Sequence, residues 1–218
     1  EFHEVKNLHE FLTIAHQMPN RFILKPADNA ASRGVILIDK RINDSLETDY
    51  KYCLQYSRSG KVLVEEFMEG PEVSVESYSV DGVPHIVTIT DKIVTELPFF
   101  VEIGHTEPSR LSEKVQKEIR QVAVKAIAAI GMKNGPTHTE LKITPSGVKL
   151  VEIAACLGGG FITSRLVPLS TGVDLIDCSF ATLLGKKVNW QNTINQGAAI
   201  RIIQSNSGIL KAVEGLDE

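Results

Sequence analysis

Two glutamates lie symmetrically about a short Pro-Ser-Gly turn, and this arrangement limits what the chain can fold into. Glu140 belongs to Thr-His-Thr-Glu-Leu-Lys and Glu152 to Leu-Val-Glu-Ile. A hairpin centred on Ser146 sets the two glutamates directly opposite each other on neighbouring strands. Since side chains alternate faces along a strand, both carboxylates then point the same way, with Cβ atoms about 4.5–5.5 Å apart. The segment therefore predicts an antiparallel hairpin with two acids on one face.

This close pair of carboxylates requires a positive partner. The other face of the expected hairpin is apolar and carries Leu141, Ile143, Val151 and Ile153. Like charges held this close destabilise a sheet unless a cation lies between them, and a hard divalent cation with oxygen ligands meets that need. The alternative is a solvated polar face with two unrelated surface glutamates.

Composition bounds the class of protein. With 218 residues, 43% of them hydrophobic, the chain can bury a core and form one or two compact units. A net charge of −4, no basic stripe and no long apolar run predict no nucleic-acid partner and no membrane span. Cys53, Cys156 and Cys178 lack disulfide or zinc spacing, which favours a cytoplasmic location. The first residues do not form a signal peptide, and we expect a piece of a longer protein.

Hydrophobic periods and turn residues predict the order of elements. Helices are expected over residues 7–17, 43–57, 112–130 and 173–184. Strands are expected over residues 21–26, 35–38, 61–67, 72–80, 85–90 and 197–203, besides the two strands of the hairpin. Residues 91–110 show no clear period and are interpreted as a loop. Because hairpins outnumber βαβ units, the predicted class is α+β with antiparallel sheets.

The helix over residues 112–130 is the best defined. Ser112 suits its N-cap and Gly131 the position after its end. The expected buried stripe consists of Val115, Ile119, Val122, Ala126 and Ile130.

Three segments carry candidate chemistry, and the first two precede the hairpin. Lys25 ends a strand beside a loop of small residues, where a cation and backbone N–H groups could surround phosphates, although no Walker A motif is present. The second segment, residues 62–72, is an apolar strand that ends in acids and a Gly-Pro turn, and could bind an adenine edge and ribose hydroxyls. The alternatives are a surface loop with an incidental lysine, and an ordinary strand followed by an acidic turn.

The third segment is the hairpin with the glycines that follow it. Gly158, Gly159 and Gly160 allow a close backbone approach to a ligand, but Thr163 stands where a Rossmann fingerprint needs its third glycine. His138 is expected on the carboxylate face, opposite Ala154, where it could also be purely structural.

In order and spacing, the three segments resemble the ATP-grasp superfamily over residues 21–208. The hinge, Val-Leu-Val-Glu65 to Met-Glu-Gly-Pro-Glu72, is similar to that of D-alanine–D-alanine ligases. The hairpin segment and the tail are closer to L-amino-acid ligases of the bacilysin type. The resemblance implies an ATP-grasp fold of two α+β lobes with an ATP cleft between them. It implies a lead-in helix at 1–20, a small lobe at 21–68 and a large lobe at 69–210, with an N-terminal domain and a C-terminal continuation outside this chain.

The resemblance also implies roles for individual residues. Lys25 would contact the α/β-phosphates, and Ser32 in the 28–34 loop would contact the β/γ-phosphates. Glu65 would bind the adenine amino group and the Met68 backbone a ring nitrogen of the adenine. Glu72 would bind the ribose hydroxyls. Glu66 would take a second hinge contact, where D-alanine-type ligases carry lysine. Glu140 and Glu152 match the family's Mg²⁺ ligands, with Mn²⁺ as a second candidate.

Two positions depart from the family. Ala154 stands where an asparagine usually completes the metal shell, and Cys156 stands where an arginine usually holds the acyl phosphate. A neutral thiol cannot replace that arginine. Arg165 is the candidate substitute, ahead of Arg201, and His138 is the second candidate catalytic residue.

The implied reaction joins a small-molecule carboxylate and an amine at the expense of ATP, through an acyl phosphate, and gives an amide, ADP and phosphate. We expect no turnover by this segment alone, and a homodimer for the whole protein. One alternative is a nucleotide-binding or regulatory module without ligase chemistry. Another is an activity like that of carbamoyl-phosphate synthetase or biotin carboxylase.

Overall fold

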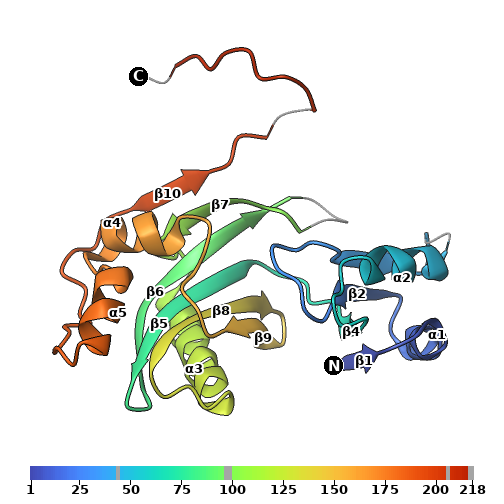
Figure 1. The fold of residues 1–218 in the computed structure, drawn as a ribbon, viewed down its shortest axis with the longest axis horizontal. Helices are drawn as coiled ribbons and strands as arrows, with labels where there is room; N and C mark the ends of the chain where they lie inside the picture. The colour runs from blue at the N-terminus through green and yellow to red at the C-terminus, as the bar shows by residue number, and fades with distance from the viewer. Residues whose placement is uncertain (43–44, 96–99, 205–206, 216–218) are drawn as a thin grey trace.

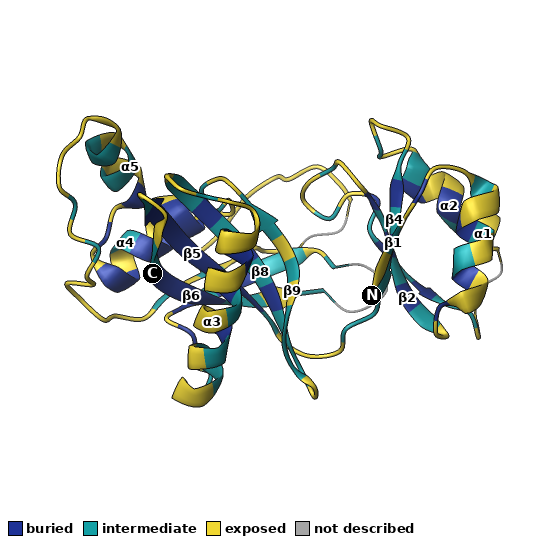
Figure 2. Ribbon diagram, turned by 90° about the horizontal axis from the view of Figure 1, so that it is seen from below, coloured by how far each residue is buried: buried dark blue, intermediate teal, exposed yellow. Residues whose placement is uncertain are grey.

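Two antiparallel sheets organise the chain, and each forms the centre of its own lobe (Figure 1). The computed structural model describes residues 1–42, 45–95, 100–204 and 207–215. Every strand pair within those residues is antiparallel, and helices cover the sheets. The predicted α+β class is confirmed. Figure 2 shows buried residues gathered in each lobe separately.

The small lobe holds a four-stranded sheet and two helices. In sheet order its strands are β1 (Phe2–Val5), β4 (Val62–Glu66), β2 (Arg21–Pro26) and β3 (Ile36–Asp39). Helices α1 (Leu8–Gln17) and α2 (Leu46–Leu54) pack on one face, against alternate side chains such as Phe22 and Leu24. The other alternate residues, Ile23 and Lys25, are left for the opposite face. Strand β1 was not expected, because a lead-in helix was predicted there.

The large lobe holds a six-stranded sheet covered on both faces. Its strands, in sheet order, are β10 (Ala198–Arg201), β7 (Glu102–Glu107), β6 (Val83–Val94), β5 (Glu72–Val80), β8 (Gly135–Thr144) and β9 (Gly147–Ala154). Helix α3 (Glu113–Ala129) packs on the face that carries Val73 and Val75. The π-helical turn η1 (Ile162–Leu166) and helices α4 (Val167–Thr171) and α5 (Leu175–Leu183) pack against Tyr78 on the other.

The helix ends and faces differ in detail from the expectations. Ser112 is the N-cap of α3 but its side chain makes no capping hydrogen bond, and Gly131 has the left-handed φ of +69° that its position requires. The α3 stripe is rotated: Ala123 and Ile127 are buried, whereas Ile130 is 48% exposed. The expected helix over 173–184 begins at Leu175, after the unpredicted η1 and α4. Residues 43–44 of the expected helix over 43–57 lie outside the described residues.

The prediction of a loop over residues 91–110 was wrong. Strand β6 continues to Val94, and β7 pairs with it in a register that sets Lys92 opposite His105. Residues 96–99 of that range lie outside the described residues. The two strands place charged side chains on a sheet face that meets a cavity. The alternation of polar and apolar residues expected for a half-buried strand is therefore weak there.

The hairpin register confirms the central expectation with one correction. Glu140 pairs with Glu152 and His138 with Ala154, as predicted. The turn itself is one residue tighter, since Thr144 pairs with Gly147, and a bulge between Glu140 and Leu141 restores the register. The extra residue changes the faces: Val148 packs under α3 and Val151 lines the cavity, so Val151 does not belong to the apolar face.

Among the described residues no single helix is long and apolar enough to cross a bilayer, although the bent pair Ile162–Thr171 and Leu175–Leu183 meets the criterion by length and composition.

Candidate functional site

One cavity of about 440 Å³ brings together segments that are far apart in the sequence. Nine of the ten residues predicted as site residues line it: Lys25, Ser32, Glu65, Glu66, Met68, Glu72, His138, Glu140 and Glu152. They come from β2 and its loop, from the end of β4 and the hinge after it, from β5 and from the carboxylate hairpin. The tenth, Arg165, lies exposed on η1 and is not among the lining residues.

The small-lobe wall of the cavity carries a lysine already paired with a carboxylate. Strands β2 and β4 are neighbours in the sheet, so Lys25 Nζ lies 3.0 Å from Glu65 Oε1, with both side chains largely covered. Glu66, one residue on, forms an ion pair with Lys149 of β9. The loop after β2 turns tightly, with left-handed φ angles at Ala31 and Ser32 of 58° and 52°. This wall can offer a cation, hinge backbone groups and a tightly turned loop to a ligand.

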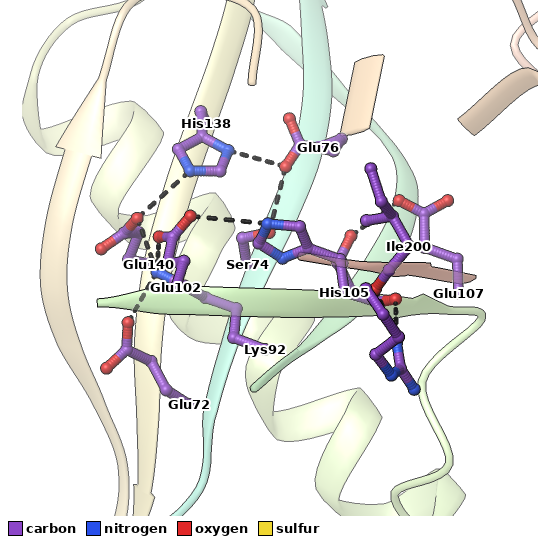
Figure 3. Close-up of polar contacts among 12 residues, drawn as sticks. Glu72, Ser74, Glu76, Lys92, Glu102, His105, Glu107, His138, Glu140 and Ile200 are labelled. Atoms are coloured by element: carbon purple, nitrogen blue, oxygen red, sulfur yellow. Dashed lines mark hydrogen bonds and ion pairs between the residues drawn. The ribbon is translucent and has the colours of Figure 1, made fainter. Parts of the chain in front are cut away.

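Lys92 is the centre of the charge network on the large-lobe wall (Figure 3). Its ammonium lies 2.7 Å from Glu72, 2.7 Å from Glu102 and 2.8 Å from Glu140, and its side chain is 2% exposed. Burial alone would lower the pKa of Lys92, but the three carboxylates outweigh it and raise that pKa. A lysine therefore supplies part of the positive charge that the acidic hairpin was expected to need.

Glu140 is held by one of its two oxygens. Both Lys92 Nζ and, at 3.3 Å, His138 Nε2 reach Oε1. Among the described residues nothing bonds to Oε2. Burial raises the pKa of Glu140, but the bonds from His138 and the charge of Lys92 prevail and hold it at about 2. The carboxylate is thus ionised and fixed, with one oxygen left for a ligand.

His138 is a charged member of this network. Its Nδ1 lies 2.7 Å from Glu76 Oε1. Burial lowers the pKa of His138, yet its contacts with Glu140 and Glu76 overcome that effect and raise it to about 10. At neutral pH the ring is an imidazolium between two carboxylates, which does not suit a general base.

Glu152, across the hairpin from Glu140, has no hydrogen bond or ion pair within the described part of the chain. Burial and the nearby charge of Glu140 raise its pKa. Two carboxylate side chains on one face, one from each glutamate, supply the oxygen ligands that a hard divalent cation prefers. Among the described residues, no three His, Cys, Asp or Glu side chains are placed so that together they could hold one metal ion. A cation here would need its remaining ligands from water or from a bound molecule such as a nucleotide.

The two departures from the family pattern both lie at this cavity. Ala154 and Cys156 are lining residues, and Cys156 is exposed. Neither arginine considered as a replacement is among the lining residues. Arg201 of β10 donates instead to the backbone oxygen of His105, at 2.9 Å. The cationic side chains that line the cavity are Lys25, Arg33, Lys92, Lys142 and His138.

Sequence reasoning missed four residues of this site: Glu76, Lys92, Glu102 and His105. Glu76 had a signal, because the alternating strand from Glu72 sets Glu72, Ser74 and Glu76 on one face. The other three lie in the segment taken as a loop. His105 Nε2 lies 3.5 Å from Glu102 Oε2, and this contact with the charge of Lys92 holds the pKa of Glu102 at about 2.

Gly158 and Gly160 of the glycine triplet lie close to protein side chains, while Gly159 and Gly160 line the cavity. A Cβ on Gly158 would lie 2.6 Å from Glu76 Oε2, and one on Gly160 would lie 3.1 Å from His105 Nε2. The close approach expected of these glycines is therefore made in part to buried acids and histidines beneath the loop.

Comparisons with known proteins agree with this architecture. The family model of the ATP-grasp domain matches residues 18–165. Alanine–anticapsin ligase of Bacillus subtilis strain 168 is 30% identical over 178 residues, which cover 71% of this chain and 37% of the ligase. Carnosine synthase 1 of Homo sapiens is 27% identical over 171 residues, or 74% of this chain and 21% of the synthase.

The fold is also found in a solved structure. The crystal structure of L-amino acid ligase from Bacillus licheniformis superposes with a TM-score of 0.82 at 24% identity, over 99% of this chain and 52% of that one. The chain thus spans about half or less of the length of these relatives. On the match to the family model and this shared architecture, the chain belongs to the ATP-grasp family.

Proposed function

We propose that this chain is the nucleotide-binding core of an ATP-dependent carboxylate–amine ligase. One observation carries the proposal: residues expected to contact a nucleotide and a cation, from three separate segments, line a single cavity. In the proposed reaction a substrate carboxylate oxygen takes the γ-phosphoryl group of ATP and ADP leaves. The amine nitrogen then displaces phosphate from the acyl phosphate and an amide forms. Relatives named as ligases and a synthase support this class of reaction.

The proposed roles follow from charge and position. Lys25 and the loop with Ser32 would hold the phosphates, Glu65 and the Met68 backbone the adenine, and Glu72 the ribose. Glu140 and Glu152 would hold Mg²⁺, which when bound neutralises charge on the transferred phosphoryl group. Lys92 would keep Glu72 and Glu140 at a fixed separation. Most of the catalysis would then come from positioning and charge neutralisation.

A second function is favoured by two positions in the same cavity. Cys156 and Ala154 line it where the family pattern has an arginine and an asparagine, and no arginine proposed as a replacement lines it. Such a chain could bind Mg-ADP or Mg-ATP as a regulatory module without forming product. The two functions share nucleotide binding and differ in turnover.

Calorimetric titration of the chain with ADP, with and without Mg²⁺, tests the shared step. Binding strengthened by Mg²⁺ is expected, and Lys25→Met should abolish it. Lys61→Met is the matched control, because Lys61 lies just before β4 and pairs with Glu4 outside the cavity. If ADP does not bind, or binds equally to both variants, the proposal fails.

Turnover separates the two functions. The whole protein is incubated with Mg-ATP and a panel of amino-acid pairs, and phosphate release is measured. Release stimulated by particular pairs, with amide product, supports the ligase. Nucleotide binding without pair-stimulated release supports the regulatory module.

A further inference from the structure

Glu76 is a buried carboxylate to which none of the roles above assigns a task. It lies in the middle of β5 and is 1% exposed. The hydroxyl of Ser74 donates to its Oε1 at 3.2 Å, and His138 Nδ1 lies 2.7 Å from the same oxygen (Figure 3). Burying a carboxylate costs folding free energy unless the carboxylate is paired and hydrogen-bonded. The partner of Glu76 therefore indicates its role.

His138, the partner of Glu76, also contacts Glu140 of the expected cation site. Strands β5 and β8 pair Glu76 with His138, and Glu140 follows two residues later on the same face of β8. The imidazole bridges the two carboxylates, with Nδ1 on Glu76 and Nε2 3.3 Å from Glu140 Oε1. Glu76 is thus linked to Glu140 through the side chain of His138.

The bridge has a directional effect on Glu140. His138, on the same strand as Glu140, and Lys92, on β6, both reach Oε1 and leave Oε2 without a protein partner among the described residues. Two donors on one oxygen fix the rotation of the carboxylate, so that the other oxygen has a defined position. Glu152 lies across the hairpin from it.

The pair is also enclosed by the glycine loop. A Cβ on Gly158 would lie 2.6 Å from Glu76 Oε2 and 2.9 Å from His138 Nδ1, closer than such contacts allow. Only glycine lets the loop cover the pair without displacing it. The loop therefore covers Glu76, which is 1% exposed, while the His138 ring still lines the cavity.

We propose that Glu76 is a positioning residue: through His138 it fixes Glu140 so that Oε2 is presented to a divalent cation shared with Glu152. The inference rests on the proposed function, because it assumes a cation at these two glutamates. Partners that orient metal-binding side chains are worth about 10–100-fold in metal affinity. A competing explanation is that Glu76 and His138 form an ion pair that stabilises only the sheet.

Glu76→Gln separates these explanations. ADP affinity is measured calorimetrically over a series of Mg²⁺ concentrations, together with unfolding by urea. We expect the apparent Mg²⁺ affinity to fall about 10–100-fold, with the affinity for ADP in the absence of Mg²⁺ unchanged. Glu107→Gln is the matched control: Glu107 is also a fully buried carboxylate of this sheet with hydroxyl partners, but it does not contact His138. That control should keep the Mg²⁺ dependence of the unmodified chain.

A double-mutant cycle tests the route through His138. In a His138→Gln background, Glu76→Gln should cause no further loss of Mg²⁺ affinity, because its effect has already been removed. If Glu76→Gln does not fold, Gly158→Ala displaces the same pair while retaining both side chains, and the same loss is expected.

Two results would overturn the inference while leaving the proposed function in place. One is Mg²⁺-dependent ADP binding by Glu76→Gln equal to that of the unmodified chain. The other is an equal loss in Glu107→Gln. If instead the unmodified chain shows no effect of Mg²⁺ on ADP binding, the proposed function and this inference fail together.

Discussion

The small lobe packs Phe22, Leu24 and Val64 beneath its helices, whereas the large lobe buries Glu76, Glu107 and many hydroxyls within its sheet. All fourteen buried polar or charged residues found among the described residues lie between Ser74 and Thr171. In the small lobe the polar side chains that line the cavity, such as Lys25, stand on the face away from the apolar core.

Because of this difference, the residues that stabilise the fold and the residues that line the cavity are separate in the small lobe but overlap in the large lobe. In the small lobe one face of the sheet supplies the folding energy and the other face contacts the cavity, so the two can change independently. In the large lobe the groups that fix the cavity wall are themselves buried, and their removal changes both stability and binding. Substitutions in the two lobes should therefore have different signatures.

The largest effect on unfolding is expected for Phe22→Ala. Phe22 is fully buried under the small-lobe helices, so the substitution leaves a cavity and should cost about 3–5 kcal/mol. Urea denaturation followed by circular dichroism measures the change. Phe2→Ala, at a side chain that is 72% exposed, is the control and should cost less than about 0.5 kcal/mol. A loss for Phe22→Ala no greater than for Phe2→Ala would contradict an apolar core in this lobe.

Lys92→Met should come next, at about 3 kcal/mol, because it leaves three partly buried carboxylates without their shared cation. The value lies at the low end for such networks, since Lys142 still lies 3.4 Å from Glu72. Adding Glu102→Gln should recover part of the loss by removing one negative charge. Lys51→Met, in an exposed pair with Glu47, is the control. Equal unfolding midpoints for Lys92→Met and Lys51→Met would rule out the network.

Sequence patterns predicted what depends on local spacing. The strand at 72–80 and the opposition of Glu140 and Glu152 were confirmed, since alternation and a Pro-Ser-Gly turn determine them within a few residues. Lys92 was missed because its role depends on residues that are distant in the sequence. The Asp91-Lys92 pair interrupts the apolar alternation and indicates the start of a loop unless the three carboxylates that surround the lysine are known. Those carboxylates come from three other strands, β5, β7 and β8, so only the sheet order reveals them.

In the candidate site, too, the residues within local motifs were predicted, and the features that depend on distant contacts were missed. Lys25, Glu72 and the glutamate pair belong to motifs whose order could be recognised. The bulge that turns Val151 toward the cavity, and the exposed position of Arg165 on an unpredicted π-helical turn, depend on packing between distant segments.

A smaller, pH-dependent effect is expected at Glu107. Burial raises its pKa to about 7, against hydrogen bonds from Ser170 and Thr90, and the charge of Glu76 adds to the rise while His105 opposes it. The folded chain therefore keeps the proton up to about pH 7, while the unfolded chain releases it near the ordinary value of 4.5. The stability that this proton confers is complete below about pH 4.5 and is lost as the pH rises through 7.

Urea titrations between pH 5 and pH 8 measure this change. The Glu107 contribution should fall by about 2 kcal/mol over that range, and Glu107→Gln, which stays neutral, should show a flatter profile. Thr13→Val, on the exposed part of α1, is a control that should leave the profile unchanged. Identical pH profiles for the Glu107 variant and the unmodified chain would show that folding does not raise the pKa of this carboxyl.

The smallest change in stability is expected for Glu152→Gln. This substitution best distinguishes residues that bind a ligand from residues that stabilise the fold. Glu152 has no partner among the described residues, and its charge opposes that of Glu140, so the unfolding free energy should change by less than about 0.5 kcal/mol, toward greater stability. The same substitution should abolish the effect of Mg²⁺ on ADP binding, because it removes an anionic ligand. A calorimetric Mg²⁺ series and urea denaturation on one preparation measure both quantities. A variant that unfolds more easily and still responds to Mg²⁺ would show that Glu152 serves the fold, and the cation would then have to be sought elsewhere in the cavity.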